Sequence, residues 1–505
     1  MFTTVPSAAV LGLECAPITI EVDISGTWPG FTIVGLPDTA IQEARERIRT
    51  AWKNTNLSFP ANSRIIVNLA PADVRKEGSA YDLPIALGMF LSAEKITYDL
   101  STSLFVGELA LDGSLRHTAG ILPLAIYAQS HHITSIFVPQ INAEEASIVP
   151  NTTVYPVTSF AELIDHITGK KQIKPQPKAD IAQWTHTYAH DLDMSLIKGQ
   201  EFTKRGLEIA AAGAHNIILN GPPGSGKTLL ARTLSSILPR MTVDEMIEVT
   251  KIYSVAGLLP SDRPIISTRP FRAPHHSASG VALVGGGKFP KPGEISLAHR
   301  GVLFLDEFPE FPRTVLENLR QPLEDGLITI SRAQGTLSFP ARFSLVASQN
   351  PCPCGYATDT VRPCTCAPMQ IERYKKKISG PLLDRIDLHV EVPRVEFEKL
   401  SSNELSESSE IIRERVEKAR ERQTRRFSHL SIETNAEMKN KELKEFCTLN
   451  ETSLELMRHA VSQMNLSARS YHRLLKVART IADLADEDMI KTEHIAEALQ
   501  FRTKL

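Results

Sequence analysis

A strong charge of one sign is missing from this 505-residue sequence, and so is any long apolar run. Against 56 Lys and Arg stand 58 Asp and Glu, which gives a formal net charge of -2. Such a balance creates no global basic field, so any contact with nucleic acid must come from local patches, and composition neither supports nor excludes DNA. No stretch reaches the roughly 18 apolar residues that span a bilayer, and residues 1–16 lack a positively charged lead. We expect a cytoplasmic protein without membrane contact.

Cysteine is scarce, with six residues, and the sequence has no short-period repeat, which argues against a solenoid. Four of the six cysteines crowd together, which indicates a metal site in a reducing compartment more than a disulfide framework. They form a C-x-C…C-x-C pattern in a predicted loop: Cys352, Cys354, Cys364 and Cys366. Four thiolates suit a tetrahedral Zn²⁺ site, which would stiffen a loop too short for its own core. Four reduced, packed thiols are the alternative.

The length predicts roughly three domains. Residues 1–168 alternate strand-like and helix-like runs, and a helix is predicted to begin near Asp38, with Arg45, Arg47 and Arg49 on a solvated face. Residues 169–183 contain the polar segment GKKQIKPQPK and mark a linker. A second α/β region covers residues 184–395, and helix-forming residues dominate 396–505, where we predict an α-helical lid. The predicted fold class is α/β.

The strongest motif is a phosphate-binding loop. GPPGSGKT fits the pattern G-x-x-x-x-G-K-[ST], with an apolar run before it and a helix-compatible run after it. Glycines let backbone N–H groups turn toward the phosphates, and the helix N-terminus adds a partial positive charge. Lys227 is predicted to contact the β- and γ-phosphates of ATP, and Thr228 to bind Mg²⁺. The other residues of this predicted nucleotide site are Gly221, Pro222, Pro223, Gly224, Ser225 and Gly226.

Two further apolar runs end in polar side chains. VLFLDEF delivers Asp306 and Glu307 at the end of a predicted buried strand. We expect Asp306 to hold Mg²⁺ through water and Glu307 to deprotonate the attacking water, with a surface acid pair as the alternative. The third run ends in Ser-Gln-Asn, and its strand should lie between the previous two. Asn350 is therefore predicted to sense the γ-phosphate, against the alternative of an Asn turn before Pro351.

These motifs, in the order GPPGSGKT, VLFLDEF, SQNPCPCG and SGPLLDRIDLHVEVP, resemble the Mg-chelatase-like AAA+ ATPases of the YifB/ComM type, which are associated with bacterial natural transformation. The resemblance covers essentially the whole chain, including SARSYHRLLKVARTIADL near its end. It implies that Arg385 is an arginine finger that completes the ATP site of a neighbouring subunit, which requires a ring, expected to be a hexamer. Without the family, an ion pair of Arg385 with Asp384 or Asp387 would be preferred. Arg469 matches the sensor 2 position, with Arg473 as a rival.

The resemblance also implies helicase or branch-migration activity on single-stranded or branched DNA. Two alternating runs flank Arg332-Ala-Gln-Gly and predict a β-hairpin just before the strand of Asn350. Related helicases place such a hairpin in the pore, where Arg332 could contact a phosphate. A glycine-rich stretch with Lys288 and Lys291 would be a second pore loop. Solvated loop residues are the alternative for all three side chains.

The N-terminal region resembles the Lon-protease-like (S5-like) α/β domain found as the ChlI-type domain of this family. In that alignment Ala80 stands where the protease has its serine, and Leu122 where it has its lysine. A Ser–Lys dyad needs both a nucleophile and a base, so we expect a structural or DNA-guiding role for this domain. Ser79 stands directly beside the position of the protease serine. A DNA motor is the leading prediction, a Mg-chelatase-type protein-remodelling ATPase the first alternative, and an ATP-dependent protease the second.

Overall fold

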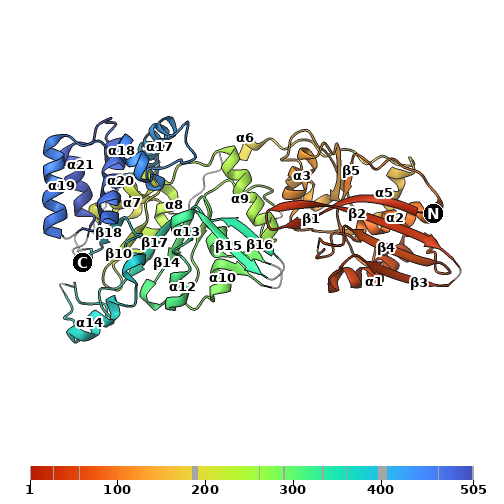
Figure 1. Ribbon diagram of the computed structural model, residues 1–505, viewed down its shortest axis with the longest axis horizontal. Helices are drawn as coiled ribbons and strands as arrows, with labels where there is room; N and C mark the ends of the chain where they lie inside the picture. The colour runs from red at the N-terminus through yellow and green to blue at the C-terminus, as the bar shows by residue number, and fades with distance from the viewer. Residues whose placement is uncertain are drawn as a thin grey trace. The chain divides into compact units, whose positions relative to one another are not determined.

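The computed structural model describes residues 2–26, 28–55, 57–74, 76–184, 192–260, 262–287, 290–332, 335–359, 361–395, 406–464 and 466–502. Its contacts divide the chain into two compact units, shown in Figure 1. Unit 1 contains Met1–Thr187 and Val243–Ser267, and unit 2 contains Tyr188–Thr242 and Thr268–Leu505. The chain therefore passes between the units three times. Residues 243–267 lie between two strands of unit 2 in sequence. Their contacts nevertheless assign them to unit 1, together with the N-terminal residues.

Unit 1 contains a four-stranded sheet in the order β1 (Phe2–Leu11), β2 (Glu14–Ser25), β4 (Arg64–Ala70), β3 (Gly30–Val34). The first two pairs are antiparallel and β3 runs parallel to β4. Burial alternates along β4, where Ile65, Val67 and Leu69 face the core, as expected for a sheet covered on one side. Helix α2 (Asp82–Glu94) packs on β1 and β2 and is buried along most of its length.

The rest of unit 1 mixes short strands with helices. A parallel sheet has the order β5 (Ser103–Phe105), β8 (Ser135–Pro139), β9 (Thr153–Val157), and β6 (Glu108–Leu109) pairs with β7 (Leu115–Arg116). The helices are α1 (Thr39–Asn54), α3 (Ile121–Ser130), α4 (Ala143–Ala146), α5 (Phe160–Ile167), α6 (Ile181–Trp184) and α9 (Val243–Ala256). This architecture confirms the predicted α/β class.

Helix α1 begins where the sequence predicted, because the Asp38 carboxylate accepts the N–H of Ile41 at 2.8 Å and caps the first turn. The expectation that Arg47 is solvated is wrong. Its guanidinium donates to both carboxylate oxygens of buried Asp82, at 2.8 and 3.0 Å. Burial raises the pKa of Asp82 to about 6, although Arg47 acts in the opposite direction. The pair thus keeps a buried carboxylate compensated, a need that the sequence of α1 does not reveal.

A second buried carboxylate attaches α9 to the rest of unit 1. Glu145 is 5% exposed and accepts hydrogen bonds from Leu122 N (2.9 Å), Asn142 Nδ2 (3.0 Å) and Ser254 Oγ (2.5 Å). The N–H of Gly120 donates to the Ser254 carbonyl at 3.0 Å. Burial raises the pKa of Glu145, and its three donors oppose that rise. Because an unpaired buried carboxylate is costly, the Ser254 hydroxyl is a specific anchor for α9.

Unit 2 contains a five-stranded, wholly parallel sheet. Its order is β11 (Phe271–Arg272), β14 (Val302–Leu305), β17 (Ser344–Gln349), β10 (Ile217–Asn220), β18 (Leu388–Glu391). Helix α7 (Glu201–Gly213) precedes the first of these strands. The helices between the strands are α8 (Lys227–Ile237), α10 (Gly280–Val284), α11 (Glu294–Leu297), α12 (Arg313–Glu317), α13 (Pro322–Asp325), α14 (Pro368–Lys375) and α15 (Gly380–Leu383). Short β12 (Gly285–Gly286) pairs with β13 (Lys291–Pro292), and β15 (Leu327–Arg332) pairs with β16 (Gly335–Pro340).

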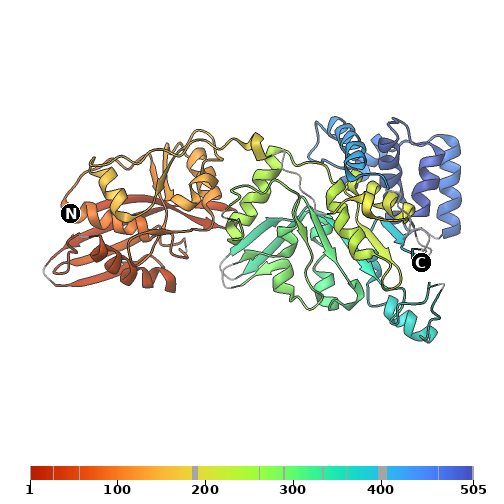
Figure 2. The same cartoon turned by 180° about the vertical axis from the view of Figure 1, so that it is seen from behind.

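The C-terminal part of unit 2 is helical, as predicted. It consists of α17 (Ser409–Arg426), α18 (Asn440–Phe446), α19 (Glu451–Met464), α20 (Ala468–Leu484) and α21 (Thr492–Gln500). Helices α17 and α20 pack on α7, and Figure 2 shows this blue group beside the yellow α7. Leu207 of α7, Ile217 of β10 and Ala478 of α20 share one hydrophobic core. The helical part and the sheet are therefore stabilised by the same burial of apolar surface.

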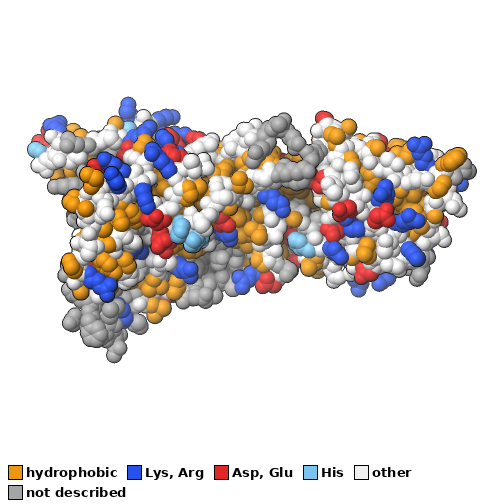
Figure 3. Space-filling view, turned by 90° about the horizontal axis from the view of Figure 1, so that it is seen from below, with side chains coloured by type: hydrophobic (Ala, Val, Ile, Leu, Met, Phe, Trp, Pro, Cys, Tyr) orange, Lys and Arg blue, Asp and Glu red, His pale blue; other side chains and the backbone are white. Residues whose placement is uncertain are grey.

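Charged side chains of both signs are interspersed on the face seen in Figure 3, in line with the near-zero net charge. The described helices include none with the length and apolar character that crossing a membrane demands. Local contacts, rather than the overall composition, must therefore identify what the protein does.

We predict that Ser254→Ala loosens α9. The substitution removes one donor from buried Glu145 and should cost about 1–3 kcal/mol, the usual penalty for an unsatisfied buried polar group. Hydrogen–deuterium exchange should show faster exchange of the α9 amides. Ser130→Ala is the matched control, because its exposed hydroxyl contacts only α3 and its neighbour. Equal exchange of α9 in both variants would contradict the anchoring role.

Candidate functional site

The predicted phosphate loop joins β10 to α8, as the sequence indicated. Gly224 and Gly226 have φ angles of 78° and 89°, which lets the loop turn sharply into the helix. The first N–H groups of α8 lack intrahelical partners and carry the partial positive charge of the helix N-terminus. Lys227 Nζ donates to the carbonyls of Gly221 (2.7 Å) and Pro222 (2.9 Å), and burial lowers its pKa. Carbonyl oxygens of the loop thus hold a buried ammonium group at the N-terminus of α8.

Side-chain oxygens from three segments meet next to this loop. Thr228 Oγ1 donates to Asp306 Oδ2 at 2.9 Å, and Ser348 Oγ donates to Asp306 Oδ1. The sheet order explains the meeting, because β17 lies between β10 and β14 and all three strands end at the same edge. Hydroxyl and carboxylate oxygens are the donor set that Mg²⁺ prefers. Sequence reasoning missed Ser348, although alternation along a strand puts it on the same face as Asn350.

Asn350 follows β17 and contacts the phosphate loop. Its Oδ1 accepts a hydrogen bond from Lys227 Nζ at 3.2 Å. The central position of its strand, which the sequence analysis expected, is confirmed by the sheet order. Its predicted role as a γ-phosphate sensor stays a prediction. The contact shows that the amide and the loop lysine face the same space.

Glu307 lies one residue beyond Asp306 in a left-handed backbone conformation, with φ 53°. Its N–H donates to Asp306 Oδ1 at 3.0 Å, while its own carboxylate is directed to His276, with Nδ1 and Oε2 3.2 Å apart. A left-handed conformation is costly for a residue with a side chain and is concentrated at functional sites. The backbone therefore sends the two neighbouring carboxylates to different partners.

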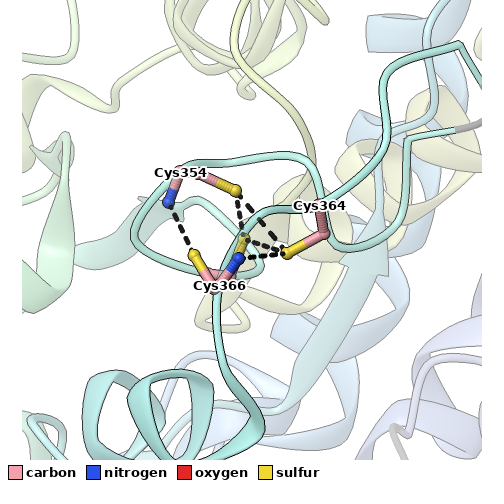
Figure 4. Close-up of side chains that lie close together, drawn as sticks. Cys354, Cys364 and Cys366 are labelled. Atoms are coloured by element: carbon pink, nitrogen blue, oxygen red, sulfur yellow. Dashed lines mark hydrogen bonds between the residues drawn. The ribbon is translucent and has the colours of Figure 1, made fainter.

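The four clustered cysteines converge, as Figure 4 shows for three of them. The Sγ atoms lie 3.3 Å (Cys352–Cys354), 3.7 Å (Cys352–Cys364) and 3.6 Å (Cys354–Cys364) apart. All four Sγ atoms lie within 4.8 Å of one another. Disulfide bonding would require about 2.05 Å between two sulfurs, so these are free thiols. Backbone N–H groups of Tyr356 and Thr365 lower the pKa of Cys354 to about 5.

The cysteine loop packs directly against the phosphate loop. Gly355, between the two cysteine pairs, is buried with φ 86°, and a Cβ built on it would lie 2.6 Å from Pro223 Cδ. Only glycine therefore allows the two loops to approach this closely without a shift. Asn350 stands two residues before Cys352, so one short segment carries both the predicted sensor and the cysteine cluster.

Similarity to known proteins shows which family this chain belongs to. Three family models match the chain. The model described as "Magnesium chelatase, subunit ChlI" matches residues 193–400, and "Subunit ChlI of Mg-chelatase" matches residues 20–142. The model described as "Magnesium chelatase, subunit ChlI C-terminal" matches residues 406–502. The chain is 45% identical over 502 residues to competence protein ComM of Haemophilus influenzae, covering 98% of this chain and 96% of that protein. It is 43% identical over 500 residues to the uncharacterized protein YifB of Salmonella typhimurium, covering 99% and 96%. The chain belongs to the Mg-chelatase-like YifB/ComM family. The magnesium-chelatase 38 kDa subunit of Rhodobacter capsulatus is more distant, 28% identical over 240 residues, covering 44% of this chain and 59% of that protein.

Arg385, which the family resemblance predicts to be an arginine finger, is 9% exposed and engaged within its own chain. Its guanidinium contacts the Glu324 carboxylate and donates to the Pro381 carbonyl at 2.8 Å. Neither Asp384 nor Asp387 is its partner, because Glu324 takes that place. Arg385 and, more weakly, Arg469 lower the pKa of Glu324. Arg385 is thus held by a carboxylate of α13, and its role as a finger stays a prediction.

The two candidates for sensor 2 differ in their surroundings. Arg473 pairs with buried Asp387 at 2.6 Å, and His215 contacts the same carboxylate at 3.2 Å. Burial raises the pKa of Asp387, but the Arg473 charge and the hydrogen bond with His215 act against it, and that pKa lies far below its usual range. Arg469, one turn earlier on α20, is exposed. The structure therefore gives Arg473 a structural ion pair and favours Arg469 as the sensor 2 candidate.

The positions that correspond to the protease dyad hold no such pair. Leu122 is fully buried at the start of α3, and its N–H binds Glu145. Ala80 uses its carbonyl to accept the N–H of Gly107 at 2.8 Å. Adjacent Ser79 donates its hydroxyl to Glu108. The predicted loss of protease chemistry remains a prediction, and these contacts agree with it.

The predicted hairpin is confirmed. Strands β15 and β16 pair antiparallel, with Arg332 opposite Gly335, just before β17. The turn between them, the side chain of Arg332 and the whole of Lys288 lie outside the described residues. Lys291 is exposed in β13. DNA contacts by these three basic residues therefore stay predictions.

We predict that Gly355→Ala weakens nucleotide binding. The new Cβ meets Pro223 and must adopt a left-handed φ, which together should cost about 1–3 kcal/mol and displace the phosphate loop. Titration with a fluorescent ATP analogue measures the affinity, and thermal denaturation measures stability. Gly380→Ala is the control, since a Cβ there meets nothing within 4 Å. Wild-type affinity in the Gly355 variant would contradict the contact.

Proposed function

We propose that this chain is an AAA+ ATPase that assembles as a hexameric ring in the cytoplasm and moves DNA strands, as a helicase or branch-migration motor, during natural transformation. The observation that supports it best is the meeting of Lys227 and Asn350, and of Thr228 and Asp306, at one edge of the parallel sheet. This arrangement combines a phosphate-binding ammonium group with oxygen ligands for a divalent cation. The other parts of the proposal depend on the ring and on DNA.

The groups around the phosphate loop fit a bound nucleotide. Ser225 Oγ is buried and, among the described residues, has no hydrogen-bond partner. Lys227 Nζ, from which burial has removed water, bonds to the loop's own carbonyls. Phosphate oxygens would accept from both, since each is a donor facing the loop. The donor set of Thr228 and Asp306 would hold Mg²⁺, which supplies charge neutralisation on the phosphates.

The proposed reaction is hydrolysis of the γ-phosphoryl group of ATP. Glu307 accepts a proton from the attacking water while the water oxygen forms a bond to the γ-phosphorus. The bond between the γ-phosphorus and the β,γ-bridging oxygen breaks, so ADP and inorganic phosphate leave. Lys227 stabilises the phosphate charge, and Asn350 orients the γ-phosphate or the water. Glu307 thus accepts a proton, Lys227 supplies a positive charge, and Asn350 supplies a hydrogen bond.

The contacts of Arg385 are compatible with the proposed assembly into a ring. In the single chain its guanidinium is held by Glu324 rather than by the chain's own phosphate loop. We propose that it turns to the ATP of the neighbouring subunit. There a guanidinium stabilises the charge on the transferred phosphoryl oxygens and raises the hydrolysis rate by roughly 10³-fold or more. Exposed Arg469, which also faces Glu324, would act as sensor 2.

Two observations support DNA as the substrate. The hairpin of β15 and β16 comes directly before β17 in sequence, which would couple a loop in the pore to the nucleotide site through Asn350. The relative that is 45% identical over nearly the whole chain is named a competence protein. Single-stranded or branched DNA would pass through the ring and contact Arg332, Lys288 and Lys291 through its phosphates.

A protein-remodelling ATPase of the Mg-chelatase kind is the second candidate. It is favoured by the family models, whose descriptions name magnesium chelatase. Against it, the similarity to a magnesium-chelatase subunit is 28% and covers 44% of this chain. Stimulation of ATP turnover by protein or porphyrin, rather than by DNA, would favour this candidate.

The functional test compares ATP turnover with and without branched DNA. The wild type should be stimulated by DNA, and Arg332→Ala should keep basal turnover while losing stimulation and strand displacement. Loss of one phosphate contact per subunit should also make the dependence of DNA affinity on salt shallower. Arg425→Ala, which removes an exposed arginine from α17, is the matched control. Strand displacement at the wild-type rate by the Arg332 variant would contradict the pore contact.

The same assay tests the ring. Arg385→Ala should bind ATP but lose turnover with or without DNA, and Lys227→Ala should lose binding or turnover. Glu307→Gln should bind ATP and stop hydrolysis. A mixture of the Arg385 and Lys227 variants should recover turnover only where an intact finger faces an intact loop. No recovery in mixed rings would contradict action between subunits.

We propose further that the cysteine loop holds a structural Zn²⁺. A tetrahedral zinc–thiolate site with bonds of about 2.3 Å places its sulfurs about 3.8 Å apart, close to the separations of 3.6 and 3.7 Å to Cys364. Backbone N–H groups of Cys354 and Cys366 donate to Sγ atoms of the cluster at 3.4 Å, which suits thiolates. Because Gly355 touches Pro223, the metal would also stabilise the neighbouring phosphate loop.

Purified protein should carry about one zinc per chain. Cys352→Ser or Cys366→Ser should release it and increase hydrogen–deuterium exchange in the loop next to Asn350, because the ligands fix this segment. Cys15→Ser, which lies in unit 1, should retain the metal. Elemental analysis measures the metal content, and absence of zinc from protein prepared without chelators would remove the site.

A further inference from the structure

A histidine contacts the carboxylate that we propose as the base. His276 Nδ1 lies 3.2 Å from Glu307 Oε2, and the two side chains are 35% and 56% exposed. A carboxylate oxygen can accept a hydrogen bond from an imidazole N–H, and a separation of 3.2 Å is within the reach of such a bond. Oε2 is the Glu307 oxygen that lies toward His276.

The sheet brings the two residues together. Strand β11 runs parallel to β14, with Phe271 opposite Val302 and Arg272 opposite Leu303. The segments that follow parallel strands leave the sheet at the same edge, which is where ligands bind in such sheets. His276 follows β11 and Glu307 follows β14, so their contact results from strand pairing and not from closeness in sequence.

The imidazole ring of His276 is held on two sides. It lies against the ring of His275 at 4.1 Å between centroids, and Phe311 approaches it edge-on at 6.4 Å. Ser277 fixes His275, with 2.8 Å between its Oγ and His275 Nδ1 and with its N–H donating to the same nitrogen at 3.3 Å. Phe311 is 4% exposed and therefore rigid. This packing accompanies an orientation in which Nδ1 lies toward Glu307.

Glu307 needs such an orienting contact. Its backbone is confined to a left-handed conformation and its N–H is bonded to Asp306, but its side chain is more than half exposed. An exposed carboxylate samples several rotamers, whereas a proton acceptor must be held close to the direction of the attacking water. A donor fixed on a neighbouring strand reduces that freedom.

We propose that His276 is a positioning residue for ATP hydrolysis, which donates a hydrogen bond from Nδ1 to Glu307 Oε2 and presents the other carboxylate oxygen to the lytic water. The inference rests on the proposed ATPase function. It concerns orientation of the base and not nucleotide binding, because His276 contacts neither the phosphate loop nor the Thr228–Asp306 pair in the described structure.

The test measures kcat, KM for ATP and affinity for a fluorescent ATP analogue in the full-length protein. His276→Ala should lower kcat about tenfold to a hundredfold, the loss expected for a misplaced catalytic group, with KM and affinity unchanged. His276→Asn should restore much of kcat, because its amide nitrogen can stand where Nδ1 stands. His459→Ala, an exposed histidine of α19, should behave as wild type.

A double variant separates positioning from a general structural effect. If His276 acts through Glu307, His276→Ala should add little further loss of single-turnover hydrolysis to Glu307→Asp, whose shorter carboxylate no longer reaches Nδ1 but keeps a measurable rate. Wild-type or increased kcat in His276→Ala, no rescue by Asn, or additive losses would each overturn the inference. A wild-type protein that hydrolyses no ATP would instead overturn the proposed function, so the two failures are distinguishable.

Discussion

The hydrogen-bonded pair of Thr228 and Asp306 depends on one constraint, the placement of β17 between β10 and β14 in a parallel sheet. Parallel strands a few ångströms apart deliver their carboxyl ends to one edge. The hydroxyl of the phosphate loop, the carboxylate after β14 and the hydroxyl of Ser348 therefore meet there, although they are far apart in sequence. A different order of these strands would separate the oxygens, even with every motif intact in the sequence. The remaining parts of unit 2 are arranged around this edge.

Two neighbouring features stiffen the same edge. The cysteine loop begins beside Asn350 and touches the phosphate loop at Gly355 and Pro223. On the other side His276 reaches Glu307 from the strand next to β14. Groups that stabilise a developing charge lower the activation free energy most when they are already in position, because they need not reorganise in the transition state. Contacts on both sides of the edge therefore restrict the groups that we propose to take part in hydrolysis.

Unit 1 shows how a buried charge can attach a segment that is distant in sequence. Glu145 is surrounded by donors from Leu122, Asn142 and Ser254, and the last of these lies on α9. A buried carboxylate without partners would be strongly unfavourable, so each donor is specific. In sequence α9 follows the helix of the phosphate loop after only a few residues, which links unit 1 covalently to the segment that follows the nucleotide site.

Much of the fold was predictable because its signals are local. The phosphate loop, the apolar strand before Asp306, the hairpin of β15 and β16 and the long helix ending at Leu484 each carry their pattern within a few consecutive residues. Family resemblance supplied the position of Arg385, which no local pattern distinguishes. The convergence of the four cysteines was predictable from their spacing alone.

Other contacts were decided only by tertiary structure. Arg47 was assigned to solvent but pairs with buried Asp82, and Arg385 pairs with Glu324 rather than with its neighbouring aspartates. Ser348, His276 and the assignment of α9 to unit 1 were not foreseen. The sequence determined which residues can bind phosphate, metal or a proton, because that chemistry belongs to single side chains and short spacings. The strand order and the burial of charged groups decided which of them meet, because these depend on how distant segments pack.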